Sequence, residues 1–171
     1  LYTPLYDDES IPYIGNVFCP HNEDLYVFTN YSKAYRYNYL EKEFNLCFYL
    51  PSEDGLVIDA KIFKGKLWLL VDKYGIYKID LATYVTEENF NFLNETKERN
   101  PSRALHIDKN GLIWIGTMKG LYILNPETKE YSLHQHSKTN PFTLPDNSVW
   151  TIAEDDQKNL WIGTYSGGLC Y

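Results

Sequence analysis

Few side chains in this sequence have the type and spacing that catalysis or metal binding requires. His134 and His136 stand two residues apart, so on a strand they project from one face and could begin a metal site. No third ligand follows nearby, and a solvated strand is the simpler interpretation. His106 could act as a general base or ligand donor, although a hydrogen-bonded core histidine is the commoner state. His21 lies among polar residues and is expected to be solvated.

The sequence contains no motif for a nucleophile elbow, a zinc protease, a phosphate loop or a dinucleotide site. Asp108-Lys-Asn-Gly111 resembles the start of a calcium loop, but no bidentate Glu follows at the required position, so a hairpin turn is expected. Glycoside hydrolysis needs an acid and a base a few ångströms apart, and the sequence does not establish such a distance for Asp59 and Glu154. We therefore expect no catalytic residues, no cofactor and no metal site.

The composition excludes further classes of function. The chain has 171 residues with 16 Tyr, 8 Phe and 4 Trp, a mixture that suits half-buried β-strands. Its 16 basic and 23 acidic residues give a net charge of −7, which would repel a phosphate backbone, so nucleic acid is not an expected partner. No stretch approaches the roughly 20 apolar residues of a membrane helix, so this segment is not expected to contact a membrane.

Three cysteines occur in unrelated contexts, without the spacing of a metal site or a redox motif. The simplest interpretation of Cys19, Cys47 and Cys170 is three small buried thiols. A disulfide between any two of them stays open if the compartment is oxidising.

A repeated segment organises the chain. The segment from Asp108 to Tyr122 returns 47 residues later, and both copies contain Trp-Ile-Gly-Thr followed by Gly-Leu. Weaker copies precede them, and the aligned aromatic anchors are 42, 46 and 47 residues apart. These anchors are Tyr26, Trp68, Trp114 and Trp161. A fixed period of this size indicates a repeat architecture.

Each repeat has the pattern of four short antiparallel strands joined by tight turns, which is typical of a β-propeller blade. We predict an all-β chain of four four-stranded units, at about residues 14–50, 57–93, 102–136 and 148–171, with a strand at 1–6 that resembles a fourth strand. The first strands, such as 57–60 and 104–107, would line the channel. Gly116 and Gly163 would permit close packing between blades.

The ends of the chain allow two interpretations. In one, residues 1–6 complete the last blade and close a small ring. In the other, which we favour because four blades is the low end of the known range, the chain is a fragment of a larger propeller. An open array would expose an unpaired edge and should self-associate.

Binding residues are expected on the loops that a propeller places on one face. The candidates are the aromatic and basic side chains Tyr31, Tyr74, Arg103, Lys119, Trp150 and Tyr165. Aromatic faces stack on sugar rings, while Arg and Lys donate hydrogen bonds. The long connection 137–147 is either a binding loop or, as we favour, a segment whose Phe142 and Leu144 hold adjacent blades together.

The Trp-Ile-Gly-Thr unit, together with Asn140-Pro-Phe-Thr-Leu-Pro-Asp-Asn-Ser-Val149, resembles the two-component regulator propeller repeat. Residues 102–171 carry nearly all of this resemblance. It implies a propeller of the seven-bladed type in the periplasmic sensor region of a hybrid two-component system or sensor histidine kinase. It further implies a membrane-proximal module, a kinase elsewhere in the protein and an oligosaccharide signal.

The sequence thus favours a sensor segment that is not catalytic by itself, because no catalytic motif occurs in it. A propeller that serves as a protein-interaction scaffold is the alternative, since blades alone specify no ligand. A carbohydrate-active propeller enzyme is a third, weaker hypothesis.

Overall fold

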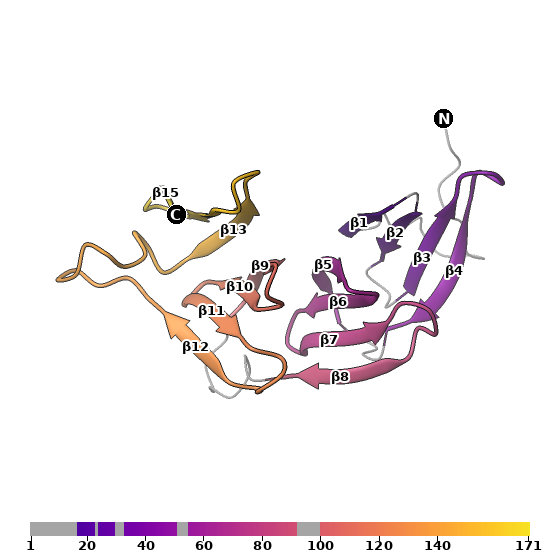
Figure 1. Ribbon diagram of the computed structural model, residues 1–171, viewed down its shortest axis with the longest axis horizontal. Helices are drawn as coiled ribbons and strands as arrows, with labels where there is room; N and C mark the ends of the chain where they lie inside the picture. Colours follow the sequence, from indigo (N-terminus) through magenta and orange to yellow (C-terminus); the bar gives the residue numbers. More distant parts are fainter. Residues whose placement is uncertain (1–16, 23, 30–32, 51–54, 92–99) are drawn as a thin grey trace. The chain divides into compact units, whose positions relative to one another are not determined.

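The computed structural model describes residues 17–22, 24–29, 33–50, 55–91 and 100–171 (Figure 1). Every regular element in these ranges is a β-strand, and none of this part of the chain forms a helix suited to span a membrane. The chain divides into two compact units, Leu1–Phe90 and Asn91–Tyr171. Each unit holds two antiparallel sheets.

The sheets of the first unit follow the order of the chain, so each strand pairs with the one before it. The first sheet contains β1 (Val17–His21), β2 (Asp24–Phe28), β3 (Lys33–Asn38) and β4 (Glu43–Tyr49). The second sheet contains β5 (Val57–Phe63), β6 (Lys66–Val71), β7 (Gly75–Asp80) and β8 (Thr86–Phe90).

The second unit repeats this arrangement. Its first sheet contains β9 (Ser102–Ile107), β10 (Ile113–Thr117), β11 (Gly120–Leu124) and β12 (Tyr131–His134). Its second sheet contains β13 (Val149–Glu154), β14 (Leu160–Thr164) and β15 (Leu169–Cys170). This last sheet has three strands in the part of the chain that the structure describes.

The turn between the third and fourth strands uses the same device in three sheets. Each of these turns has an Asn or Asp whose side-chain oxygen accepts hydrogen bonds from two backbone N–H groups just ahead in the chain. These residues are Asn38, Asp80 and Asn125. The Asn-Pro turn that the sequence indicates at Asn125 is therefore one instance of a repeated turn.

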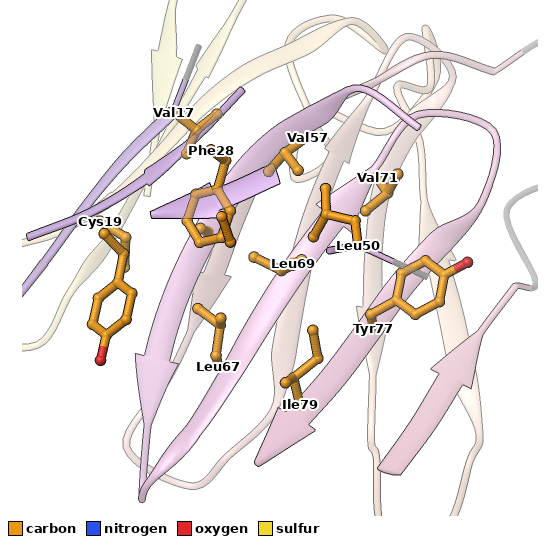
Figure 2. Close-up of a cluster of buried hydrophobic side chains, with 13 residues drawn as sticks. Val17, Cys19, Phe28, Leu50, Val57, Leu67, Leu69, Val71, Tyr77 and Ile79 are labelled. Carbon is orange, nitrogen blue, oxygen red and sulfur yellow. The ribbon is translucent and has the colours of Figure 1, made fainter. Parts of the chain in front are cut away.

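The core of the first unit lies between its two sheets, where alternate side chains meet. Leu67 and Leu69 of β6 are fully buried and lie in one cluster with Phe28 of β2 (Figure 2). Strand β6 is buried on both faces, which explains its nearly continuous apolar sequence. Complete burial of each such Leu contributes about 1.5 to 3 kcal/mol.

The second unit also has a buried cluster between its two sheets. It contains Leu121, Leu144, Val149 and Ile162, and Trp114 packs against it. Gly116 lies directly against Val149, because a Cβ added at Gly116 would stand 2.8 Å from Val149 Cγ1 and 3.1 Å from its carbonyl oxygen. The glycine of the first strong repeat therefore permits close approach of the next sheet.

The structure confirms the predicted all-β chain of four antiparallel, propeller-type sheets. The packing expected at Gly163 is different from that at Gly116, because a Cβ there would meet Thr151 Cγ2 at 2.6 Å, on the paired strand of the same sheet. The strand predicted at residues 1–6 lies outside the described residues. The channel-lining role of the first strands stays a prediction.

Candidate ligand-binding site

Three sheets carry a β-bulge near the start of their first strand. In the second unit, Ser102 pairs with Thr117 and Ala104 with Gly116, which leaves Arg103 between two paired positions. The same shift leaves Trp150 between Val149 and Thr151 in β13, and Ile58 between Val57 and Asp59 in β5. A bulge redirects the side chain of its extra residue. The repeat thus places these side chains at equivalent positions.

A backbone hydrogen bond ties each bulge to the turn after the second strand. In every case, the first turn residue donates its N–H to the carbonyl oxygen two residues before the bulged residue. The bonds run from Asp72 to Leu56 (2.9 Å), from Met118 to Pro101 (3.1 Å) and from Tyr165 to Ser148 (2.8 Å). Each bulge therefore has a fixed neighbour in the turn: Met118 stands beside Arg103, and Tyr165 beside Trp150.

In the second unit, these two pairs meet and form one cluster. The guanidinium carbon of Arg103 lies 4.8 Å from the ring centre of Trp150. The rings of Trp150 and Tyr165 stack at 5.4 Å with an interplanar angle of 28°. Nη2 of Arg103 donates to Met118 Sδ at 3.8 Å. We call Arg103, Met118, Trp150 and Tyr165 the bulge cluster.

The bulge cluster is exposed although its backbone is fixed. Tyr165 is 73% exposed, Trp150 47% and Met118 46%. The indole N–H of Trp150 donates to Ser148 Oγ at 3.0 Å, which orients the ring. An exposed, preorganised aromatic and cationic surface of this kind can stack against a ring and donate hydrogen bonds at its edge.

A carboxylate next to the cluster supports the turn. Asp146 accepts hydrogen bonds from the hydroxyl of Ser166 and the backbone N–H of Ser148. These two donors lower the pKa of the Asp146 carboxyl, with the Ser166 hydroxyl as the larger cause. The carboxylate is therefore engaged in holding the loop before β13 against the turn after β14.

The structure brings together three of the six predicted binding residues, Arg103, Trp150 and Tyr165. Lys119 follows Met118 in the same turn, and its backbone N–H donates to the side chains of Asn100 and Thr117. Met118 is a member that the sequence analysis missed. The repeat spacing in the sequence could have identified Met118, because it lies 47 residues before Tyr165, and Arg103 lies 47 residues before Trp150.

The other two predicted binding residues lie in the first unit. Tyr74 is partly buried and packs against the core cluster of that unit, while its carbonyl oxygen accepts a hydrogen bond from Asn89. Tyr31 lies outside the described residues. The role of all six residues in binding stays a prediction.

In the two strong repeats, a hydrogen bond links the anchor Trp to the hairpin turn before it. The indole N–H of Trp114 donates to Asp108 Oδ2 at 3.2 Å, and that of Trp161 to Asp155 Oδ2 at 2.8 Å. The other oxygen of each Asp accepts two backbone N–H groups of the turn. The hydrogen bond from Trp161, followed by those from Asn159, lowers the pKa of Asp155 to about 2.

The weaker repeats keep the buried anchor without this link. Trp68 stacks on Phe90 at 6.1 Å, and its buried Nε1 has no hydrogen-bond partner among the described residues. Ile62 stands six residues before it, where the strong repeats have Asp. Tyr26 is buried in the core of the first unit. Tyr26 and Trp68 are therefore buried in the packing of the first unit, whereas Trp114 and Trp161 are partly exposed.

The histidines are hydrogen-bonded. His106 Nε2 lies 3.2 Å from Glu154 Oε2, which joins β9 to β13, and Glu154 also pairs with Lys158 at 2.7 Å. His136 Nδ1 lies 2.7 Å from the carbonyl oxygen of Leu144, and His134 Nε2 lies 3.1 Å from Ser132 Oγ. In the described ranges, no group of three His, Cys, Asp or Glu is placed to hold a metal ion.

The connection from Ser137 to Asn147 differs from the expectation in one respect. Leu144 packs in the core as predicted, but Phe142 is 95% exposed and does not hold two sheets together. The loop closes on itself instead: Phe142 N–H donates to Asn140 Oδ1, and Thr143 Oγ1 accepts from Ser137 N–H. These polar bonds fix the loop in a shape that projects the Phe142 ring into solvent.

A hollow of about 520 Å³ lies at the turn between β13 and β14, away from the bulge cluster. Trp161 and Tyr171 line it, with ring centres 5.1 Å apart, together with Asp155. Asp155 is engaged with Trp161 and the turn backbone. We regard this hollow as part of the structural turn, and the bulge cluster as the better candidate because its side chains present donors and ring faces.

Comparison with known proteins identifies the repeats that form the bulge cluster. The model of the two component regulator propeller family matches residues 98–119 and 143–166. These two segments are two-component regulator propeller repeats. The first matched repeat contributes Arg103 and Met118, and the second contributes Trp150 and Tyr165. The cluster is therefore built by two adjacent propeller repeats.

Among curated proteins, the chain is similar to Histidine kinase P4 of Formosa agariphila, with 30% identity over 164 residues. The match covers 90% of this chain and 12% of that kinase, so the chain spans a small part of its relative.

Among solved structures, the propeller repeats resemble the extracellular domain of BT4673 from B. thetaiotaomicron, with a TM-score of 0.60 and 16% identity. That match covers 96% of this chain and 28% of the other. The extracellular domain of BT3049 from the same organism matches with a TM-score of 0.53 and 22% identity, over 86% of this chain and 25% of the other. The computationally designed Ika4 protein matches with a TM-score of 0.66 and 12% identity, over 99% and 97%. These likenesses describe the fold.

Proposed function

We propose that these propeller repeats are a segment of the periplasmic sensor region of a two-component signalling protein, and that the segment itself is not catalytic. The support is the family of the repeats together with the histidine kinase relative. The solved relatives BT4673 and BT3049 are extracellular domains, and BT3049 is assigned to a hybrid two component system. A location outside the cytoplasm and a kinase elsewhere in the protein follow from this proposal.

The ligand we propose is an oligosaccharide bound at the bulge cluster. The observation that carries this proposal is the exposed stack of Arg103, Trp150 and Tyr165, whose backbone is fixed by the hydrogen bonds of the two bulges. Sugar rings present apolar C–H faces that pack on aromatic rings, and their hydroxyls accept hydrogen bonds from a guanidinium. A preorganised surface loses less entropy when the ligand binds.

The partners we propose within the protein are further blades and a membrane-proximal module. Strand β15 pairs with β14 on one side and is an end strand of its sheet in the described residues. Leu169 is 61% exposed at this edge. Exposed sheet edges invite pairing with another strand, so self-association is expected where no further blade covers the edge.

Isothermal titration of the full-length protein against a panel of oligosaccharides tests the proposed ligand. We expect at least one oligosaccharide to bind, and Trp150→Ala to weaken its binding by roughly 10-fold, in line with the roughly 1 to 3 kcal/mol that aromatic stacking contributes to ligand binding. Trp68→Phe serves as a control because Trp68 is buried in the first unit. A panel in which no sugar binds contradicts the proposal.

A protein-interaction scaffold is the second candidate, and one observation favours it. Phe142 is 95% exposed on a loop that its own hydrogen bonds hold in shape. Exposed aromatic residues are enriched at protein interfaces. Affinity capture with the full-length protein, compared with its Phe142→Ser variant, distinguishes this candidate: loss of a partner only in the variant, without sugar binding by either protein, would favour the scaffold.

The enzyme hypothesis gains nothing from the carboxylates that the sequence suggested. Asp59 pairs with Lys61 at 2.8 Å, and Glu154 pairs with Lys158 at 2.7 Å. Lys158, followed by His106, lowers the pKa of Glu154, which opposes a role as a general acid at neutral pH. Incubation with polysaccharides, followed by product analysis, is the direct test.

A further inference from the structure

Arg103 differs from the other described arginine in the partners of its guanidinium. Arg36 lies 3.7 Å from the carboxylate of Asp24. Arg103 instead lies over the Trp150 ring and donates one N–H to the sulfur of Met118. In the described part of the chain, no carboxylate stands within ion-pair distance of Arg103. Among the described residues, no carboxylate therefore neutralises the charge of this cation.

The stacking on Trp150 leaves the edge of the guanidinium available. The guanidinium of arginine has five N–H donors in its plane. Met118 accepts one of them, and its thioether sulfur is only a weak acceptor. A guanidinium that stacks on an aromatic face uses its own face for that contact and keeps its edge for hydrogen bonds. The edge of Arg103 can therefore bind a planar anion with two parallel hydrogen bonds.

The carboxylate of the supporting loop, Asp146, is engaged by other donors. Both oxygens of Asp146 accept hydrogen bonds, one from Ser148 and the other from Ser166. The net charge of the whole chain is −7, so an uncompensated cation on an exposed aromatic surface is a local exception. An exposed cation of this kind favours a ligand that carries a negative charge.

We infer that the bulge cluster selects an acidic oligosaccharide, whose anionic group binds the guanidinium edge of Arg103 while a sugar ring packs on the exposed face of Tyr165. The anionic group is a carboxylate or a sulfate ester, since both offer oxygens with the spacing of the guanidinium fork. This inference rests on the proposed function, because it assigns the class of sugar that the same site takes.

Matched pairs of sugars in isothermal titration with the full-length protein test the inference. One arm compares oligogalacturonate, alginate and glucuronan oligosaccharides with their methyl esters, and the other compares sulfated oligosaccharides with their desulfated forms. We expect an acidic sugar of at least one arm to bind with an affinity roughly 10-fold or more above that of its neutral counterpart, because hydrogen bonds to charged groups are the stronger ones. Added salt should reduce that preference.

The variant Arg103→Gln identifies the residue that carries the preference. This substitution should lower the affinity for the acidic sugar to that for the neutral sugar, and it should leave the affinity for the neutral sugar nearly unchanged. Arg36→Gln is the matched control, because it removes the same charge from an exposed arginine of the first unit. Thermal unfolding of both variants checks that they fold.

The outcomes separate this inference from the proposed function. If acidic and neutral sugars bind equally, or Arg103→Gln retains the preference, the inference is wrong and the proposed oligosaccharide ligand stands. If no sugar of either kind binds, the proposed ligand is wrong and the inference fails with it.

Discussion

Replacement of Gly116 by Ala should destabilise the second unit through one identifiable contact. The added Cβ would lie 2.8 Å from Val149 Cγ1, 3.1 Å from the Val149 carbonyl oxygen and 3.3 Å from its Cβ. The side chain of Val149 is fully buried, and its carbonyl belongs to the backbone of β13, so neither can move without a shift of the sheet. Overpacking of this kind costs about 1 to 3 kcal/mol.

A double-mutant cycle measures this contact. Val149→Ala alone should cost about 2 kcal/mol, because it removes two buried methyl groups. The same change made in Gly116→Ala removes the Cγ1 atom that the new methyl group would strike. The double variant should therefore be more stable than the sum of the single changes predicts, by about 1 kcal/mol.

Urea unfolding followed by tryptophan fluorescence gives the free energies of unfolding for the cycle, and thermal unfolding should show a shift of about 2 to 4 °C per kcal/mol for a chain of this size. Gly163→Ala is the control, because its added Cβ would meet Thr151 of the same sheet and should show no coupling to Val149. Additivity of the Gly116 and Val149 changes within about 0.5 kcal/mol would refute the contact as the reason for the glycine.

Two further predictions concern titratable groups. The pKa of the Asp155 carboxyl is about 2, below its ordinary value of 3.8. The ionised carboxylate that accepts from Trp161 therefore stabilises the fold above about pH 4, and this stabilisation is lost as the pH falls toward 2. In acid unfolding, Asp155→Asn should lose less stability over this range than the unchanged protein. Burial raises the pKa of Cys19 to about 11. At pH 8, its thiol should therefore react with Ellman's reagent only after the protein unfolds. The thiols of Cys47 and Cys170 are partly exposed and should react first. Equal rates for all three thiols would contradict the burial of Cys19.

The repeat pattern in the sequence was sufficient to predict the sheets, because one period contains both the alternation of the strands and the chemistry of the turns. The link from Asp155 to the Trp161 indole was not predicted, although its signal is visible: an Asp stands six residues before the Trp in both strong repeats. The prediction lacked the hairpin geometry that brings these two side chains together.

The binding cluster was predicted in part, for a reason that lies in the bulges. Arg103 and Trp150 are among the predicted binding residues, but the register shift that redirects them is a property of strand pairing and is not visible in the alternation of the sequence. Tyr74 was selected by its aromatic type, yet it packs against the core of its unit. The exposure of Phe142 also depended on side-chain hydrogen bonds that the loop sequence alone does not specify.

The repeated bulge separates the residues that stabilise the fold from the residues that could contact a ligand. The residues at 58, 103 and 150 are an Ile, an Arg and a Trp, and their sheets tolerate this range because a bulged residue has no partner across the strand. Substitution at these positions is expected to leave the paired residues and the contact of Gly116 with Val149 in place. Each additional blade therefore supplies one more position that evolution can alter freely, so a ring of such repeats can acquire a new specificity by point substitution while its architecture stays constant.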